Sequence, residues 1–326
     1  MTTCAAPAQI SLCGDKSAGE RGVSLDFETY ELFGLNKPAP AEMNGRTRAS
    51  FVETLTAPGD ANYNPCPEAY PKPGTPEGTL AHYPDWDRAK VFPGTVRDVA
   101  VYTTPGLDRA QPASLIVFQD GNFYIPAQGQ VRAVQVLDVL HAKGEIGPTV
   151  AVFVNPGKLV GSSEPPTEQR SREYDSITPD YGRFLLEDLL PFVVEAEKLM
   201  LSDDPARRTL CGISSGGICA FTAAWHFPES FGRVLSHCGS YVNIRGGHNW
   251  PFILRATPRK PLRVFLQSGT GDGVHFTGDW PLANQTMAKA LEWSGYDHRF
   301  EFGVGGHSLR HGGAIFADSL RWLWRA

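Results

Sequence analysis

The chain has 326 residues, of which 41% are hydrophobic and 20% are charged, and its formal net charge is -5. This is the composition of an ordinary globular protein with enough apolar mass for a large core, and one α/β domain often fills such a length. The mild negative charge argues against a nucleic-acid partner, because nucleic-acid-binding proteins usually present a basic face.

The sequence shows no targeting segment, membrane span or metal motif. Residues 1–20 lack a basic stretch followed by an apolar one, so we expect no signal peptide and a cytoplasmic location. No apolar run approaches the length that spans a bilayer, which predicts no membrane partner. The six cysteines have neither Cys-x-x-Cys nor zinc-finger spacing, so we expect no metal site.

Residues 1–93 are rich in glycine and proline, and we interpret them as an irregular arm packed on the rest of the chain. Within this arm, residues 24–34 alternate well enough for a strand. Aromatic side chains such as Phe27, Tyr30 and Tyr63 need to be buried, which disfavours a free linker. The sequence leaves open whether the arm is a lid, a dimer contact or simple packing. It also leaves open whether the protein forms a homo-oligomer.

Residues 94–326 alternate between strands and helices. Apolar runs predict strands at 95–104, 113–121, 149–157, 207–214, 233–240, 261–272 and 298–303. Helical spacing predicts helices at 129–144, 180–200, 215–225, 279–296 and 312–326. This alternation predicts an α/β domain with a mostly parallel sheet flanked by helices. In such a sheet the ligand site lies beyond the carboxyl ends of the strands.

The stretch Gly212-Ile213-Ser214-Ser215-Gly216 matches Gly-x-Ser-x-Gly with Ser214 at its centre. Ser215 does not fit, because Ile213 stands two residues before it. A strand that turns sharply into a helix forces the middle residue into a strained conformation and needs small neighbours. The predicted strand before and helix after favour a nucleophile at Ser214 over a helix-capping serine in a tight turn.

A serine nucleophile needs a base and an acid, which in this architecture follow it in the order serine, acid, histidine. Asp272 comes just after the strand at 261–272, and His307 lies just beyond the strand at 298–303. We therefore expect both on the same rim as Ser214. We interpret the neighbouring candidates structurally: Asp279 as a helix cap, His275 as a loop residue, His237 as a buried strand residue and His311 as a weaker rival near the last helix.

The predicted chemistry is acyl transfer to Ser214, with His307 as base and Asp272 orienting the imidazole. The oxyanion of the tetrahedral intermediate needs donors, and we expect the backbone N–H of Ser215 to be one. The second is expected from the loop after the strand at 113–121, at Gly121 or Asn122. We interpret the preceding Asp120 as a residue that braces this loop.

Polar and aromatic residues follow the same strand ends. These candidate substrate contacts are Phe123, Tyr124, Tyr241, Asn243, Arg245 and Trp280. They predict a pocket with aromatic walls and some positive character, which suits an aromatic or carboxylated ester. The alternative is that they are ordinary packing residues of the loops.

Six segments in order resemble the esterase D-type branch of the α/β-hydrolases, and the enterobactin-esterase-like proteins within it in particular. These segments are VFPGTVRDVAVYTTPG, LIVFQDGNFY, RSREYDSITPDYGRFLLEDLLP, CGISSGG, VFLQSGTGD and FGVGGHS. The resemblance runs from about residue 90 to the end. It implies an α/β-hydrolase domain at 94–326 with Ser214, Asp272 and His307 as the catalytic triad, and neither metal nor organic cofactor. It implies structural roles for Arg170, Arg172 and Glu173.

We therefore expect a serine hydrolase that cleaves a small-molecule carboxylic ester, whether aromatic, lactone or siderophore-like. An acyltransferase is the alternative, because it would use the same three residues and the same acyl-enzyme. A non-catalytic binding protein on the same scaffold is the third reading. The occurrence of all three triad residues at strand ends argues against it.

Overall fold

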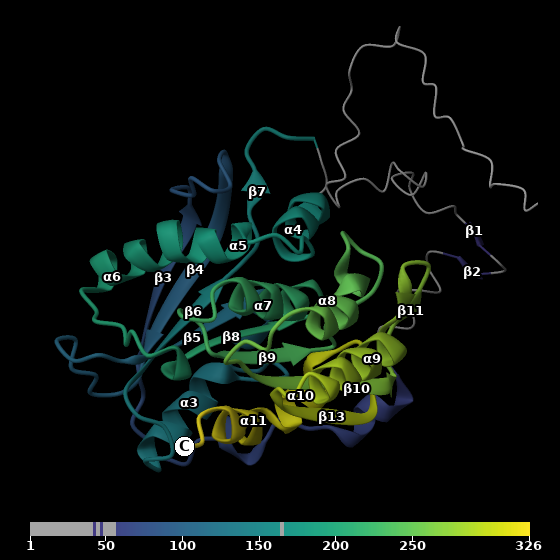
Figure 1. Cartoon of the computed structure of the whole chain (residues 1–326). Helices are drawn as coiled ribbons and strands as arrows, with labels where there is room; N and C mark the ends of the chain where they lie inside the picture. Colours follow the sequence, from purple (N-terminus) through teal and green to yellow (C-terminus); the bar gives the residue numbers. More distant parts are fainter. Residues whose placement is uncertain (1–41, 44–45, 48–56, 164–165) are drawn as a thin grey trace, which may run out of the picture.

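The computed structural model describes residues 42–43, 46–47, 57–163 and 166–326 (Figure 1). The strand expected at 24–34 lies outside this part of the chain, and so do Phe27 and Tyr30. Two short strands, β1 (Glu42–Met43) and β2 (Arg46–Thr47), pair with each other. The other described elements belong to one sheet, the helices that cover it and the segments that connect them.

The main sheet has nine strands, ordered β13-β10-β9-β8-β5-β6-β4-β3, with β7 paired to the start of β4. The strands are β3 (Thr79–Trp86), β4 (Thr95–Thr103), β5 (Ser114–Gln119), β6 (Thr149–Val154), β7 (Lys158–Leu159), β8 (Arg208–Ile213), β9 (Arg233–His237), β10 (Arg263–Gly271) and β13 (Asp297–Gly306). Pairing is parallel from β13 to β6, and antiparallel where β4 joins β6, β3 and β7. The predicted mostly parallel sheet is therefore confirmed.

Helices cover both faces of this sheet (Figure 1). One face carries α5 (Asp180–Arg183), α6 (Leu190–Glu197), α7 (Ser215–His226), α8 (Trp250–Ala256) and α9 (Trp280–Trp293). The other carries α3 (Ala133–Ala142) and α11 (Phe316–Leu323). Shorter elements complete the fold: α2 (Gly121–Tyr124), α4 (Pro166–Tyr174), α10 (Leu309–Ala314), η2 (Pro58–Asn62), η3 (Pro67–Ala69), η5 (Pro205–Arg207), η6 (Gly247–Asn249) and the hairpin β11 (Val274–His275) with β12 (Gly278–Asp279).

The two helical layers explain why the central strands are buried at nearly every position. In β5, Leu115 and Val117 join one buried cluster, while Ile116 and Phe118 join the other. Successive side chains of a strand point to opposite faces, so a strand covered on both sides has no solvent-facing position. The continuous apolar runs of the sequence are the result.

The helix expected at 180–200 is divided in the structure. It consists of α5, a π-helical segment η4 (Phe184–Leu189) and α6. Pro191 stands at the start of α6 and cannot donate a backbone hydrogen bond to the preceding turn. The wider π-helical segment lies directly before it, as such bulges usually do where the regular bonding pattern is interrupted.

The structure places a strand within the predicted arm, shortly before the expected boundary at 93/94. Strand β3 lies within the predicted arm and pairs antiparallel with β4 over most of its length. It carries Pro84 and exposed residues such as Leu80, which suit an edge strand but weaken the sequence pattern. The sheet therefore begins at Thr79, and the arm contributes one of its edges.

Candidate active site

Ser214 occupies a strained turn between β8 and α7. Its backbone has φ 58° and ψ -122°, a region that residues with a side chain rarely adopt. Gly212 allows the close approach of strand and helix, because a Cβ there would collide with the backbone of Gly216. The turn is held by the Ser214 N–H, which donates to the carbonyl of His237 on β9 at 2.9 Å.

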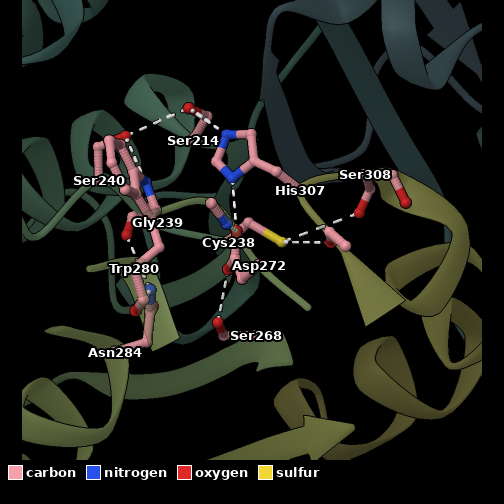
Figure 2. Close-up of polar contacts among 12 residues, drawn as sticks. Ser214, Cys238, Gly239, Ser240, Ser268, Asp272, Trp280, Asn284, His307 and Ser308 are labelled. Atoms are coloured by element: carbon pink, nitrogen blue, oxygen red, sulfur yellow. Dashed lines mark hydrogen bonds and ion pairs between the residues drawn. The ribbon is translucent and has the colours of Figure 1, made fainter. Parts of the chain in front are cut away.

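The structure brings the three predicted catalytic side chains together (Figure 2). His307 Nε2 lies 2.8 Å from Ser214 Oγ, and His307 Nδ1 lies 2.6 Å from Asp272 Oδ1. Asp272 is buried and also accepts hydrogen bonds from the Ser268 hydroxyl at 2.6 Å and the Gly273 N–H at 2.7 Å. The carboxylate is thus fixed by partners on both of its oxygens.

A second hydroxyl, which the sequence reasoning missed, contacts Ser214 from the other side. Ser240 Oγ lies 3.2 Å from Ser214 Oγ, and the Trp280 indole N–H donates to Ser240 Oγ at 3.2 Å. Indole can only donate and a carboxylate can only accept. The protons therefore point one way along the chain Trp280, Ser240, Ser214, His307 and Asp272, with the neutral imidazole protonated on Nδ1.

Cys238 lies behind Asp272 and His307, and its Sγ is 3.8 Å from the carbonyl oxygens of Gly306 and Ser308. Ligand-type atoms of Cys238, Asp272 and His307 lie within 4.8 Å of one another. A metal needs the deprotonated thiolate, whereas burial first, and the nearby Asp272 second, raise the pKa of this thiol well above its ordinary value. The donor set fits a hydrogen-bonded network better than a metal site.

The expected oxyanion donors lie at two helix starts. Ser215 is the first residue of α7, directly after Ser214, and Gly121 and Asn122 open α2. The Asn122 N–H donates to Asn155 Oδ1 at 3.1 Å. A substrate oxygen that used this donor would have to displace the Asn155 side chain.

Arg170 on α4 connects the two donor segments. Its guanidinium makes two bonds to Asp120, at 2.9 and 2.6 Å, and a third to Ser215 Oγ at 2.9 Å. Burial alone would lower the pKa of Arg170, but the bonds and charge of Asp120 raise it. Asp120 has a left-handed backbone with φ 55°. It braces its loop through Arg170, as the sequence predicted.

Four of the six expected substrate contacts are buried side chains in the structure. Tyr124 and Tyr241 are buried, and their hydroxyls bond to His237 Nδ1 and Ser236 Oγ. Arg245 is also buried, with its Nε donating to Ser171 Oγ at 3.2 Å. Aromatic and cationic residues of loops can point inward as readily as outward, and the sequence does not distinguish the two.

Trp280 is the fourth of these buried side chains, and its indole N–H bonds to Ser240 next to Ser214. It packs edge-on against His307, with ring centroids 5.6 Å apart. Phe123, which is half-exposed, and Asn243, which is exposed, remain candidates for contact with a ligand.

Asp279 and His237 have the structural roles that we expected, whereas His275 lies in strand β11 and not in a loop. Asp279 caps α9 by accepting from the Leu282 N–H at 2.9 Å. His237 is buried, and His311 stacks on Tyr63 with ring centroids 4.3 Å apart. Among the histidines that the structure describes, His307 is the one bonded to Ser214.

The sheet, the turn at Ser214 and the rim position of its partners define an α/β-hydrolase. Solved structures share this fold. An enterobactin esterase from Shigella flexneri aligns with a TM-score of 0.60 and 24% identity, over 82% of this chain and 61% of that one. A ferulic acid esterase aligns with a TM-score of 0.59 and 15% identity, over 76% and 99%.

The model of the family described as putative esterase matches residues 93–323, so the chain belongs to that family. The iron(III) enterobactin esterase of Dickeya dadantii is 29% identical over 248 residues, which cover 70% of this chain and 51% of the relative. An iron(III) salmochelin esterase of Escherichia coli O6:H1 is 26% identical over 284 residues, covering 82% and 62%.

The chain thus spans about half to three fifths of the length of these curated relatives. None of the helices in the described part of the chain is long and apolar enough to cross a membrane.

Proposed function

We propose that the protein hydrolyses a carboxylic ester through an acyl-enzyme on Ser214. The observation that carries this proposal is the bond of 2.8 Å between Ser214 Oγ and His307 Nε2, with Nδ1 held by Asp272. His307 accepts the serine proton as Oγ attacks the ester carbonyl, and then gives it to the departing alcohol. Water, deprotonated by the same imidazole, attacks the acyl group and returns the hydroxyl to Ser214.

The oxyanion of each tetrahedral intermediate is stabilised by backbone N–H groups, from Ser215 at the start of α7 and from Gly121 or Asn122. The positive end of the α7 dipole points at the same place. Arg170 supports this arrangement, because its bonds to Asp120 and Ser215 fix the two segments relative to each other.

For the substrate, we propose a siderophore-type or other aromatic ester. The named relatives are iron(III) enterobactin and salmochelin esterases. Apolar side chains that follow the strand ends are partly exposed: Phe123 after β5, and Val274 and Phe276 after β10. Such a rim suits an aromatic acyl or alcohol group. An acyltransferase would use the same triad, and no feature of the described residues favours it over hydrolysis.

The test compares native protein with Ser214→Ala on p-nitrophenyl acetate. We expect a loss of kcat on the order of 10⁶, the scale that removal of a triad serine produces. Ser294→Ala is the matched control, since that hydroxyl donates to the Leu254 carbonyl on α8 and lies outside the site. Equal rates for native protein and Ser214→Ala would refute the proposal.

A screen of siderophore, feruloyl, lactone and short acyl esters then tests the substrate class. We expect the highest kcat/KM for esters that carry an aromatic ring. Activity confined to short acyl esters would contradict the aromatic rim.

A further inference from the structure

The segment at residues 57–63 packs against the strand ends that carry the acid and the base. A Cβ at Gly271, next to Asp272, would collide with the side chain of Ala57. Likewise, a Cβ at Gly59 would collide with the backbone of Val304 on β13. The segment therefore contacts the ends of both β10 and β13 through glycine positions that permit a close approach.

Within this segment, Asp60 bonds to the residues on both sides of His307. Its Oδ1 accepts from the Gly306 N–H at 3.0 Å and from the Ser308 hydroxyl at 2.9 Å. Its Oδ2 accepts from the Ala57 N–H at 3.0 Å, which fixes the carboxylate within its own turn. The side chain is 5% exposed, so water competes little for these bonds.

Tyr63 adds a second contact from the same segment. Its hydroxyl accepts from the Val304 N–H at 3.0 Å, and its ring stacks on His311 beyond the loop. A Cβ at Gly303 would collide with this hydroxyl. The loop that carries His307 is thus bonded to the arm at residues before and after His307.

The loop needs such support because of its place in the sheet. Strand β13 is the edge strand next to β10, so no further strand of the main sheet fixes its end. The run Gly303-Val304-Gly305-Gly306 just before His307 is rich in glycine, which gives the backbone wide conformational freedom. The arm instead contacts the end of this strand at Val304.

We propose that Asp60 is a positioning residue for the proposed hydrolysis, holding His307 at hydrogen-bonding distance from Ser214 by clamping Gly306 and Ser308. This inference rests on the proposed function. The match to the family model begins at residue 93, so the clamp comes from a part of the chain outside that match.

The test uses Asp60→Ala and Asp60→Asn in the full chain. Alanine removes all three bonds, whereas asparagine keeps one acceptor oxygen and turns the other into a donor. We expect kcat on p-nitrophenyl acetate to fall on the order of 10- to 100-fold for Asp60→Ala, and less for Asp60→Asn, because small displacements of a catalytic group are costly. KM should stay near the native value, since Asp60 is not placed to touch substrate.

Asp188 provides a matched control. It is also a buried carboxylate that clamps backbone, accepting from the N–H groups of Lys90 and Val91 at 2.8 and 2.9 Å, but it lies on η4. Asp188→Ala should lower the midpoint of unfolding as Asp60→Ala does, with kcat of the folded protein unchanged. Equal losses of kcat in the two variants would overturn the positioning role, and so would native kcat in Asp60→Ala.

A crystal structure of Asp60→Ala, which removes all three bonds, gives a readout that does not depend on activity. We expect the His307 imidazole to be displaced from Ser214 or to lack defined density. An imidazole in its native place would overturn the inference. Absence of Ser214-dependent hydrolysis in native protein would instead refute the proposed function, and this structure would still decide whether Asp60 holds the loop.

Discussion

The Ser214 hydroxyl is held from two sides, by the base that would remove its proton and by a hydroxyl that donates to its oxygen. His307 Nε2 lies 2.8 Å away and Ser240 Oγ lies 3.2 Å away. Because the Trp280 indole N–H donates to Ser240 and the Ser214 proton points to His307 Nε2, the Ser240 hydroxyl is the donor in its bond to Ser214. As Ser214 loses its own proton in the reaction, this donated bond strengthens, because bonds to charged oxygens are the stronger ones.

Replacing Ser240 by alanine should therefore slow hydrolysis without abolishing it. A hydrogen bond to a charged oxygen exceeds a neutral one by about 1 kcal/mol, which corresponds to roughly a fivefold loss of kcat/KM. Trp280→Phe should act in the same direction, since it leaves Ser240 free to turn away. The double variant should lose less than the sum of the two in free energy, because both changes break one chain of bonds. Steady-state kinetics on one ester would measure all three, and strict additivity would contradict the linked chain.

At the scale of elements, helix α4 carries the pairs that tie the helical layer to the sheet. Arg97 on β4 and Glu173 on α4 form a bidentate pair at 2.7 and 3.0 Å, with both side chains fully buried. Glu173 also accepts from the Gly157 N–H at 3.2 Å, so the pair fixes the loop after β6. The contacts of Glu173 with Arg97 and Gly157 are those of a residue that holds the fold together.

Glu173→Ala should destabilise the fold by about 3–5 kcal/mol, because it leaves the Arg97 guanidinium buried without a counter-charge. Arg97→Met combined with Glu173→Met should cost less than this single change, since the pair is then replaced by apolar side chains. Urea unfolding of the three proteins would measure both effects. A cost below about 1 kcal/mol for Glu173→Ala would show that water or another group reaches Arg97.

The sequence predicted the parts of the site whose cause is local. The turn at Ser214 follows from the steric needs of Gly-x-Ser-x-Gly, and Asp272 and His307 follow from the rule that strand ends share a rim. Strand β3, Ser240 and Asp60 were missed because each depends on a contact with a distant part of the chain. Asp60 is 246 residues from Gly306, and nothing near position 60 indicates that partner.

For the whole molecule, buried histidines link stability to pH. Burial lowers the pKa of His237 to about 3, with the charge of His311 adding to the effect. The pKa values of His226 and His311 are also lowered, in both cases chiefly by burial. An unfolded histidine titrates near pH 6.5. Below that pH the unfolded chain binds protons that the folded protein does not, so the free energy of unfolding decreases as the pH falls from about 6.5 toward 3.

His237→Asn should reduce this dependence while keeping an acceptor for the Tyr124 hydroxyl. The native His237 side chain changes the free energy of unfolding by at most about 1.4 kcal/mol per pH unit between pH 6.5 and 3. Urea unfolding between pH 5 and 6.5 would measure how the free energy of unfolding changes with pH. The pKa of Glu68 is lowered to about 2, so Glu68 loses its contribution to stability only below this pH range. His226 and His311 retain theirs, so the slope should fall but not vanish. An unchanged slope would show that His237 is protonated in the folded protein.

The positive φ of Ser214 makes the candidate active site sensitive to substitutions in the elements around it. A conformation that the residue would not choose alone persists only while β8, β9 and α7 hold it. Substitutions that loosen the packing of these neighbours should let the backbone at Ser214 relax to an unstrained conformation before the sheet unfolds. We therefore expect the proposed activity to decline before the fold does, so that a normal melting curve would not by itself show that a preparation is active.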